Sequence, residues 1–290
     1  SLHFTPDNQV FVHLNKKTVS PHPTERGRTI GGDTPLGKGS YKQVSTAVNL
    51  TTGERFASAS MDPEGAKLEK KGLELFKGEK GFLQLGGEVR YTSGKKGVEK
   101  VRLLFPLAER GDLRSSIRKG TISTEEREAI SKQLIQSVAT MHAKGILHRD
   151  LKTENVLLTG EGKDIEATII DFGASIYEDD SKEKQWFSGS PKYAAPELEE
   201  AITPKSVEAA TTKASDIWTL GVVLAELCEK GSPFHIKAKA SQAEIQAKAG
   251  DIFYMKPANS IEQFIQSCLQ WDPAKRATAE ELLEIDRKST

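Results

Sequence analysis

The spacing of apolar residues changes character near Gly111, and this change limits the possible folds more than any other feature of the chain. Across 36–105 the apolar residues form short, strand-like runs separated by breaks such as Thr51-Thr52-Gly53. After Gly111 they recur at helical spacing, as at Ile130, Leu134 and Val138. A small β-rich part followed by a large helical part predicts a bilobal α+β fold.

Individual elements follow from the same patterns. Strands are predicted at 10–12, 44–49, 54–61, 82–91 and 98–105. Helices are predicted at 66–76, 123–144, 212–230, 261–269 and 279–285. The most apolar stretch, 217–228, contains a threonine, a glycine and a glutamate, and it is shorter than the roughly 20 residues of a membrane span.

Charge and cysteine content narrow the class of partner and compartment. The 290 residues contain 41 Lys plus Arg and 41 Asp plus Glu, so the formal net charge is zero. A neutral chain argues against nucleic acid or an anionic membrane as the main partner. Cys228 and Cys268 lie in apolar helical contexts, so we expect buried reduced thiols and a cytoplasmic setting, with one disulfide as the alternative.

A glycine-rich segment runs from Leu36 to Val44 with the sequence LGKGSYKQV. Gly37 and Gly39 would let backbone amides approach phosphate oxygens closely. A hairpin turn without a ligand would have the same sequence pattern, so this segment alone does not decide the function.

A more specific signal is the run HRDLKTEN at 148–155. It has the spacing of a phosphoryl-transfer catalytic loop. Asp150 could accept the proton of a substrate hydroxyl, Lys152 could neutralise charge on the transferred group, and Asn155 could hold a metal ion. The alternative is a charged surface turn.

A second acidic position follows an apolar strand pattern. In IIDFG at 169–173, Asp171 could present its carboxylate to Mg²⁺. The runs GSPKYAAPE at 189–197, DIWTLG at 216–221 and WDPAKR at 271–276 come next in the chain.

Together these motifs resemble a eukaryotic-type protein kinase over about 30–276. The resemblance implies ATP with Mg²⁺ or Mn²⁺ as cofactors and a protein Ser/Thr hydroxyl as substrate, because Lys152 and Ser190 match the serine/threonine form. It divides the chain into an extension at 1–29, a small lobe at 30–108 and a large lobe at 109–290.

The resemblance also assigns roles by position. Leu36, Val44, Ala57 and Leu157 match the residues around adenine, Phe105 the gatekeeper, and Leu107 the hinge. Asp216 matches the residue that holds the catalytic-loop backbone, and Glu197 with Arg276 a buried ion pair, the alternative being two unrelated surface charges. Glu69 best matches the small-lobe helix carboxylate, with Glu74 as its rival.

The sequence departs from the family at the third strand, where Ala59 occupies the position of the phosphate-binding lysine. Lys42 stands in place of the third glycine, two residues before Val44 and therefore on the same strand face. This arrangement resembles the with-no-lysine kinases. Three interpretations stay open: Lys42 replaces the missing lysine, Ala59 is an engineered knockout, or the chain is a pseudokinase that binds nucleotide or protein partners.

Regulation and origin are predicted from the same region. Ser188 is the best phosphorylation candidate among the serines at 175, 181, 188 and 190, and its phosphate could pair with Arg149. The acidic run at 178–180 could partly mimic that charge. The divergent small lobe suits an effector delivered by a bacterium into a host cell.

Overall fold

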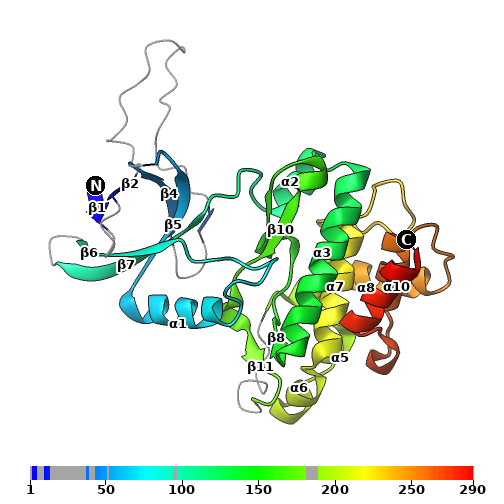
Figure 1. Cartoon of the computed structure of the whole chain (residues 1–290). Coiled ribbons are helices and arrows are strands. Elements are labelled where there is room, and N and C mark those ends of the chain that lie inside the picture. Colours follow the sequence, from blue (N-terminus) through cyan, green and yellow to red (C-terminus); the bar gives the residue numbers. More distant parts are fainter. Residues whose placement is uncertain are drawn as a thin grey trace. The chain divides into compact units, whose positions relative to one another are not determined.

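The computed structural model describes residues 2–4, 10–13, 37–38, 43–50, 52–93, 97–180 and 189–289 (Figure 1). The chain divides into two compact units. Unit 1 comprises Ser1–Glu79 and Leu83–Ala108, and unit 2 comprises Lys80–Phe82 and Glu109–Thr290. The mixed α+β class predicted from the sequence is confirmed, with an antiparallel sheet in the first unit and helices dominating the second.

Unit 1 is built on one antiparallel sheet with the order β1-β2-β4-β5-β7-β6, while β3 pairs with β4. Its strands are β1 (Leu2–Phe4), β2 (Val10–His13), β3 (Gly37–Lys38), β4 (Gln43–Asn49), β5 (Arg55–Met61), β6 (Gly87–Ser93) and β7 (Val98–Pro106). The short strand predicted at 10–12 forms, and it extends the sheet by pairing with β4.

Helix α1 (Pro63–Glu74) covers the face of the sheet that carries Ala59. Its buried Ala66 and Leu73 belong to one apolar cluster with β5 and β7. The helix begins three residues before the predicted start, because Asp62 caps it by accepting a hydrogen bond from Gly65 N at 2.7 Å and Pro63 occupies the first turn.

The strand predicted at 82–91 was wrong over its first half, since β6 begins only at Gly87. Phe82 belongs to unit 2, where its ring lies 6.0 Å from that of Phe172. Gln84 lies outside the paired strand, and its side chain stabilises the preceding turn, because its Nε2 donates to Phe76 O at 3.0 Å. The alternation of apolar residues there therefore reflects two separate packing environments.

Unit 2 contains the remaining elements (Figure 1). Its α-helices are α2 (Leu113–Lys119), α3 (Thr124–Ala143), α5 (Pro196–Glu199), α6 (Pro204–Ala210), α7 (Lys213–Leu227), α8 (Gln242–Phe253), α9 (Ser260–Cys268) and α10 (Ala279–Ser289). Its strands are β8 (Ile146–Leu147), β9 (Val156–Thr159), β10 (Glu166–Ile169) and β11 (Ile176–Tyr177), which pair as β9 with β10 and β8 with β11. Short 3₁₀ turns are η1 (Thr153–Asn155), η2 (Gly162–Asp164), η3 (Phe172–Ala174), η4 (Pro191–Tyr193) and η5 (Pro273–Lys275).

Helix α7 forms the centre of unit 2, because every residue from 215 to 227 on it is buried. It packs against α3 and α9. The helix ends at Leu227, three residues before the predicted end, since Cys228 leaves the helical conformation. The helices α2, α5, α6 and α8 were not predicted.

Both cysteines are free and buried, which confirms the predicted reduced thiols and excludes the disulfide alternative. Cys228 is 4% exposed and Cys268 is fully buried. Burial raises the pKa of both thiols above the ordinary value. In the ranges that the structure describes, no helix has both the length and the apolarity needed to cross a membrane.

Candidate active site

Asp216 on α7 holds the backbone that follows β8. Its Oδ2 accepts from His148 N at 2.7 Å and its Oδ1 from Arg149 N at 2.9 Å. Burial opposes ionisation of this carboxyl, but the His142 hydrogen bond at 3.2 Å and the backbone donor of Arg149 outweigh it and lower the pKa of Asp216. An ionised side chain from the central helix therefore fixes the start of the 148–155 loop.

Two residues of this region adopt a strained backbone. Arg149 has φ 68° and Asp171 has φ 67°, and among the described residues they are the only non-glycine positions with positive φ. Each such conformation costs on the order of 1–3 kcal/mol and persists only where surrounding contacts enforce it. Arg149 lies just after β8 and next to Asp150, and Asp171 lies directly before η3. Asp150 and Asp171 are residues that the sequence analysis selected.

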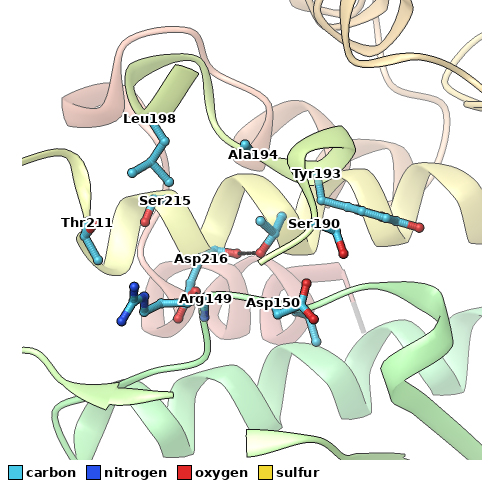
Figure 2. A pocket seen from close by; sticks show the side chains of 11 residues that line it. Arg149, Asp150, Ser190, Tyr193, Ala194, Leu198, Thr211, Ser215 and Asp216 are labelled. Carbon is cyan, nitrogen blue, oxygen red and sulfur yellow. Dashed lines mark hydrogen bonds between the residues drawn. The ribbon is translucent and has the colours of Figure 1, made fainter. Parts of the chain in front are cut away.

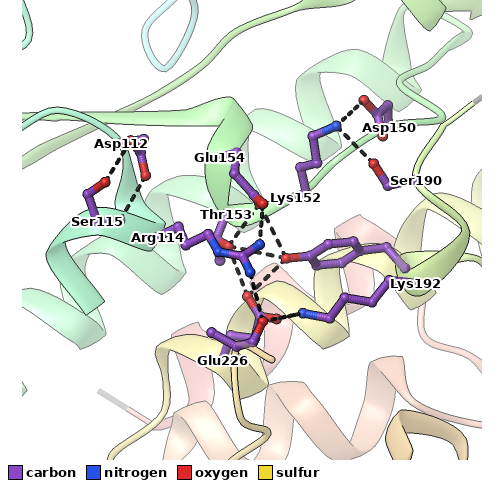
Figure 3. Close-up of polar contacts among 12 residues, drawn as sticks. Asp112, Arg114, Ser115, Asp150, Lys152, Thr153, Glu154, Ser190, Lys192 and Glu226 are labelled. Carbon is purple, nitrogen blue, oxygen red and sulfur yellow. Dashed lines mark hydrogen bonds and ion pairs between the residues drawn. The ribbon is translucent and has the colours of Figure 1, made fainter. Parts of the chain in front are cut away.

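Asp150 is held through one carboxylate oxygen (Figure 3). Lys152 Nζ donates to Asp150 Oδ2 at 2.6 Å and to Ser190 Oγ at 2.9 Å. Asn155 Nδ2 donates to the Asp150 carbonyl at 2.8 Å. The other oxygen, Asp150 Oδ1, is buried and has no hydrogen-bond partner among the residues that the structure describes. A buried acceptor of this kind is suited to an incoming hydroxyl group.

Asp171 follows β10 in the same unit. The backbone joins it to the 148–155 loop, because Ile170 N donates to Asn155 O at 2.9 Å and His148 Nε2 lies 3.3 Å from Ile170 O. Burial lowers the pKa of His148. No hydrogen bond or ion pair involves the Asp171 carboxylate within the described ranges. An unpaired carboxylate and the amide oxygen of Asn155 are ligand types that Mg²⁺ accepts, and Mg²⁺ takes its other ligands from water and substrate phosphates.

A pocket in unit 2 lies between the 148–155 loop, the 190–198 segment and α7 (Figure 2). Its lining includes Arg149, Asp150, Ser190, Tyr193 and Asp216. Sequence reasoning selected four of these residues and missed Tyr193, although that tyrosine stands inside the run 189–197.

A network of ion pairs and hydrogen bonds was also missed (Figure 3). It joins Arg114 to Glu154 and Lys192 to Glu226, and Thr153 and Tyr193 hydrogen-bond to Glu226. These charged residues come from separate helices and 3₁₀ turns far apart in the sequence, and no sequence pattern indicated that they would meet.

The predicted pair of Glu197 and Arg276 forms. Arg276 Nη1 and Nη2 contact Glu197 Oε1 and Oε2 at 2.5 and 2.7 Å, and the arginine side chain is fully buried. The alternative of two unrelated surface charges is therefore wrong.

In unit 1 the structure places the predicted residues as follows. Ala57 is half-buried and pairs with Phe105 across β5 and β7, and Val44 pairs with both Gly37 and Ala59. Leu107 is half-buried just after β7, and Leu157 of unit 2 is half-buried on β9. Leu36, Gly39, Lys42 and Ser188 lie outside the described residues.

Two observations bear on the missing lysine and its expected carboxylate partner. Ala59 is 3% exposed and packs in the apolar cluster with Met61, Leu73 and Leu103. Glu69 is half-buried on the α1 face that also carries Leu73, whereas Glu74 forms an exposed pair with Lys77. This placement favours Glu69 over Glu74 as the inward carboxylate.

The protein kinase domain family model matches residues 32–286, so the chain belongs to this family. It is 29% identical to a probable serine/threonine-protein kinase of Dictyostelium discoideum over 96% of this chain and 54% of that protein. It is 31% identical to calcium/calmodulin-dependent protein kinase type II of Caenorhabditis elegans over 86% of this chain and 35% of that protein. It is 28% identical to calcium/calmodulin-dependent protein kinase type I of Schizosaccharomyces pombe over 93% of this chain and 80% of that protein. The chain thus spans about half or less of the first two relatives.

Proposed function

We propose that the chain is a serine/threonine protein kinase that transfers the γ-phosphoryl group of ATP to a protein hydroxyl. One observation carries the proposal. Asp150 is held by Lys152 through Oδ2, while its buried Oδ1 has no partner in the described part of the chain and would accept a substrate hydroxyl. The contact of Lys152 with Ser190 supports the serine/threonine class, because these are the two residues that match that form.

Each residue of unit 2 then has a definite task. Asp150 orients the acceptor hydroxyl and takes its proton, and Lys152 places a positive charge where the phosphoryl group passes. Asn155 and Asp171 would hold the metal ion that accompanies ATP. When bound, Mg²⁺ or Mn²⁺ with ATP supplies the phosphoryl group and neutralises part of its charge.

In unit 1 we propose that Lys42 supplies the phosphate-binding charge that Ala59 cannot. Val44 pairs with Ala59 in the β4–β5 ladder. Strand alternation assigns residue 42 to the same face as Val44, so a lysine there would serve the face that lacks one. Gly37 would bring backbone amides to the phosphates, Val44, Ala57 and Leu107 would contact adenine, and Glu69 would be the helix carboxylate. Leu36 and Gly39 complete this proposal for unit 1, and Leu157 is the adenine contact proposed in unit 2.

The competing function is a non-catalytic module that binds nucleotide or a protein partner. The apolar packing around Ala59 is the observation that favours it, because a catalytic lysine there would share a cluster with Met61 and Leu103. The intact set of Asp150, Asn155 and Asp171 favours the kinase.

Phosphotransfer from ATP to a protein substrate separates the possibilities. If Lys42 has the proposed role, the natural chain is active and Lys42→Ala lowers kcat/KM at least a hundredfold. Wild-type activity in Lys42→Ala would refute the relocation. If Ala59 is an engineered knockout, the chain as given is inactive and Ala59→Lys restores activity.

Asp150→Asn serves as the matched control, because it keeps the size of the side chain and removes the proton acceptor. Activity that survives in Asp150→Asn belongs to a contaminant. Thermal shift with Mg²⁺ and ATP identifies the remaining case, in which nucleotide stabilises a chain that transfers nothing.

A further inference from the structure

Glu226 near the end of α7 is an ionisable side chain with no exposed surface. Thr153 Oγ1 donates to its Oε2 at 2.9 Å, and Tyr193 OH donates to the same oxygen at 3.0 Å. Lys192 Nζ contacts its other oxygen. A buried carboxylate without a cation is costly, and Lys192 supplies a cationic partner for Glu226 in the core.

Lys192 also reaches a second anchor, since its Nζ donates to Ala238 O at 2.8 Å. Ala238 lies between α7 and α8, and its carbonyl accepts a further bond from Arg114 at 3.0 Å. The Lys192 ammonium therefore links its own 3₁₀ turn, η4, to α7 and to the α7–α8 connection.

Lys192 lies in the 3₁₀ turn η4, which begins at Pro191, directly after Ser190, and ends at Tyr193. Tyr193 N donates to Ser190 O at 2.9 Å and thereby fixes the serine to the turn. Ser190 in turn accepts the bond from Lys152 that places the lysine ammonium beside Asp150. The chain of contacts thus runs from Glu226 through Lys192 and Ser190 to the catalytic loop.

We propose that Lys192 is a positioning residue for the phosphoryl acceptor: its tether to Glu226 and Ala238 fixes the 190–193 turn beside Lys152 and Asp150, where the protein substrate must dock. The inference rests on the proposed kinase function. It assigns to Lys192 an effect on the protein substrate and none on ATP, because the contacts named join the 190–193 turn to the catalytic loop, to α7 and to the α7–α8 connection, and none involves a residue proposed to bind adenine or the metal ion.

The test compares KM for the protein substrate with KM for ATP in the full chain. Lys192→Met keeps the apolar stem and removes the tether, and we expect KM for the protein substrate to rise about tenfold while KM for ATP stays within twofold. Lys192→Arg should recover most of the loss, because a guanidinium can still bond both Glu226 and Ala238. Lys213→Met is the matched control, since it removes the exposed ion pair of Lys213 with Glu178.

A second variant separates positioning from stability. Lys192→Met leaves an uncompensated carboxylate in the core and could unfold the chain, whereas Lys192→Met with Glu226→Gln keeps acceptors for Thr153 and Tyr193 without a buried charge. We expect this double variant to fold with near-wild-type thermal stability and still show the raised KM. A double variant with wild-type stability and wild-type KM would overturn the proposal.

Hydrogen exchange gives a readout that needs no turnover. The amides of Tyr193 and Ala194 are hydrogen-bonded within the turn, so loss of the tether should speed their exchange at least tenfold in the double variant and not in Lys213→Met. Unchanged exchange would refute the tether even if the chain proves catalytically silent. A chain that stays silent with Ala59→Lys as well, together with accelerated exchange in the variant, would refute the kinase function and keep the tether.

Discussion

Gly189, directly before Ser190, lies close to the backbone of the 148–155 loop. Its φ is 121°, a region that is essentially restricted to glycine, and a Cβ there would lie 2.3 Å from Arg149 O. The close approach brings the backbone of two separate motifs into contact. The geometry around Asp150 therefore requires a residue without a side chain at position 189.

Replacing this glycine should destabilise the fold. For Gly189→Ala we expect a loss of about 1–3 kcal/mol in the free energy of unfolding, because the new Cβ combines backbone strain with a clash against rigid main chain. Urea denaturation measures the loss. Gly231→Ala is the control, since a Cβ at Gly231 meets no atom within 4 Å. Equal effects at the two positions would contradict the strain argument.

At the scale of elements, the start of α3 is fastened more firmly than an ordinary helix end. Ser123 and Glu126 form a reciprocal capping box. Glu126 also accepts from Gly162 N at 2.9 Å and pairs with Arg110 at 2.5 Å. The Arg110 hydrogen bond, opposed by burial and aided by the two backbone donors, lowers the pKa of Glu126 to about 2. One carboxylate thus joins α3 to two neighbouring loops.

This carboxylate should make stability depend on pH in the acid range. Because the folded pKa of about 2 lies below the ordinary value of 4.5, the stabilisation is fully present above pH 4.5 and declines as pH falls toward 2. Urea midpoints measured between pH 6 and 3.5 should fall less steeply in Glu126→Gln than in the wild type. Glu281→Gln removes an exposed carboxylate that caps α10 with Thr278 in the same way, and it controls for the loss of a helix-capping carboxylate as such.

At the scale of the whole molecule, unit 2 is held together by contacts between residues far apart in the sequence. Arg276 makes two bonds to Glu197 across 79 positions and also donates to the carbonyls of Gln270 and Ala214. The pair fastens the segment after the catalytic region to the turn before α10. This contact therefore ties the segment that follows the candidate site to the C-terminal part of unit 2.

Breaking this pair should destabilise unit 2 strongly. Arg276→Met leaves Glu197 without its partner and should cost about 3–5 kcal/mol in the free energy of unfolding. Differential scanning calorimetry would show the loss. Arg287→Met, which removes an exposed pair with Glu284, should change stability by less than about 1 kcal/mol. A small effect at Arg276 would mean that the pair is replaceable by water.

Sequence reasoning was most successful where periodicity or motif spacing is strong. It predicted the long helices α3 and α7, the β4–β5 and β7 strands and the hold of Asp216 on the backbone of the 148–155 loop. It failed where local pattern and tertiary packing disagree, as at Phe82, which belongs to unit 2, bridges to Ile169 and lies near Phe172 instead of continuing β6. It also missed the ion pair of Lys192 with Glu226. The two residues are 34 positions apart, and the sequence around either one carries no pattern that indicates the other.

The two buried cysteines have a practical consequence. With Cys228 4% exposed, Cys268 fully enclosed and both thiol pKa values raised, neither offers a reactive thiolate to a maleimide in the folded chain. A cysteine can be introduced at an exposed position of each unit, such as Glu54 and Lys163. A dye or spin label would react selectively with these cysteines, and the native thiols need not be removed. Distances between the two units can thus be measured with and without ATP while Cys228 and Cys268 are kept.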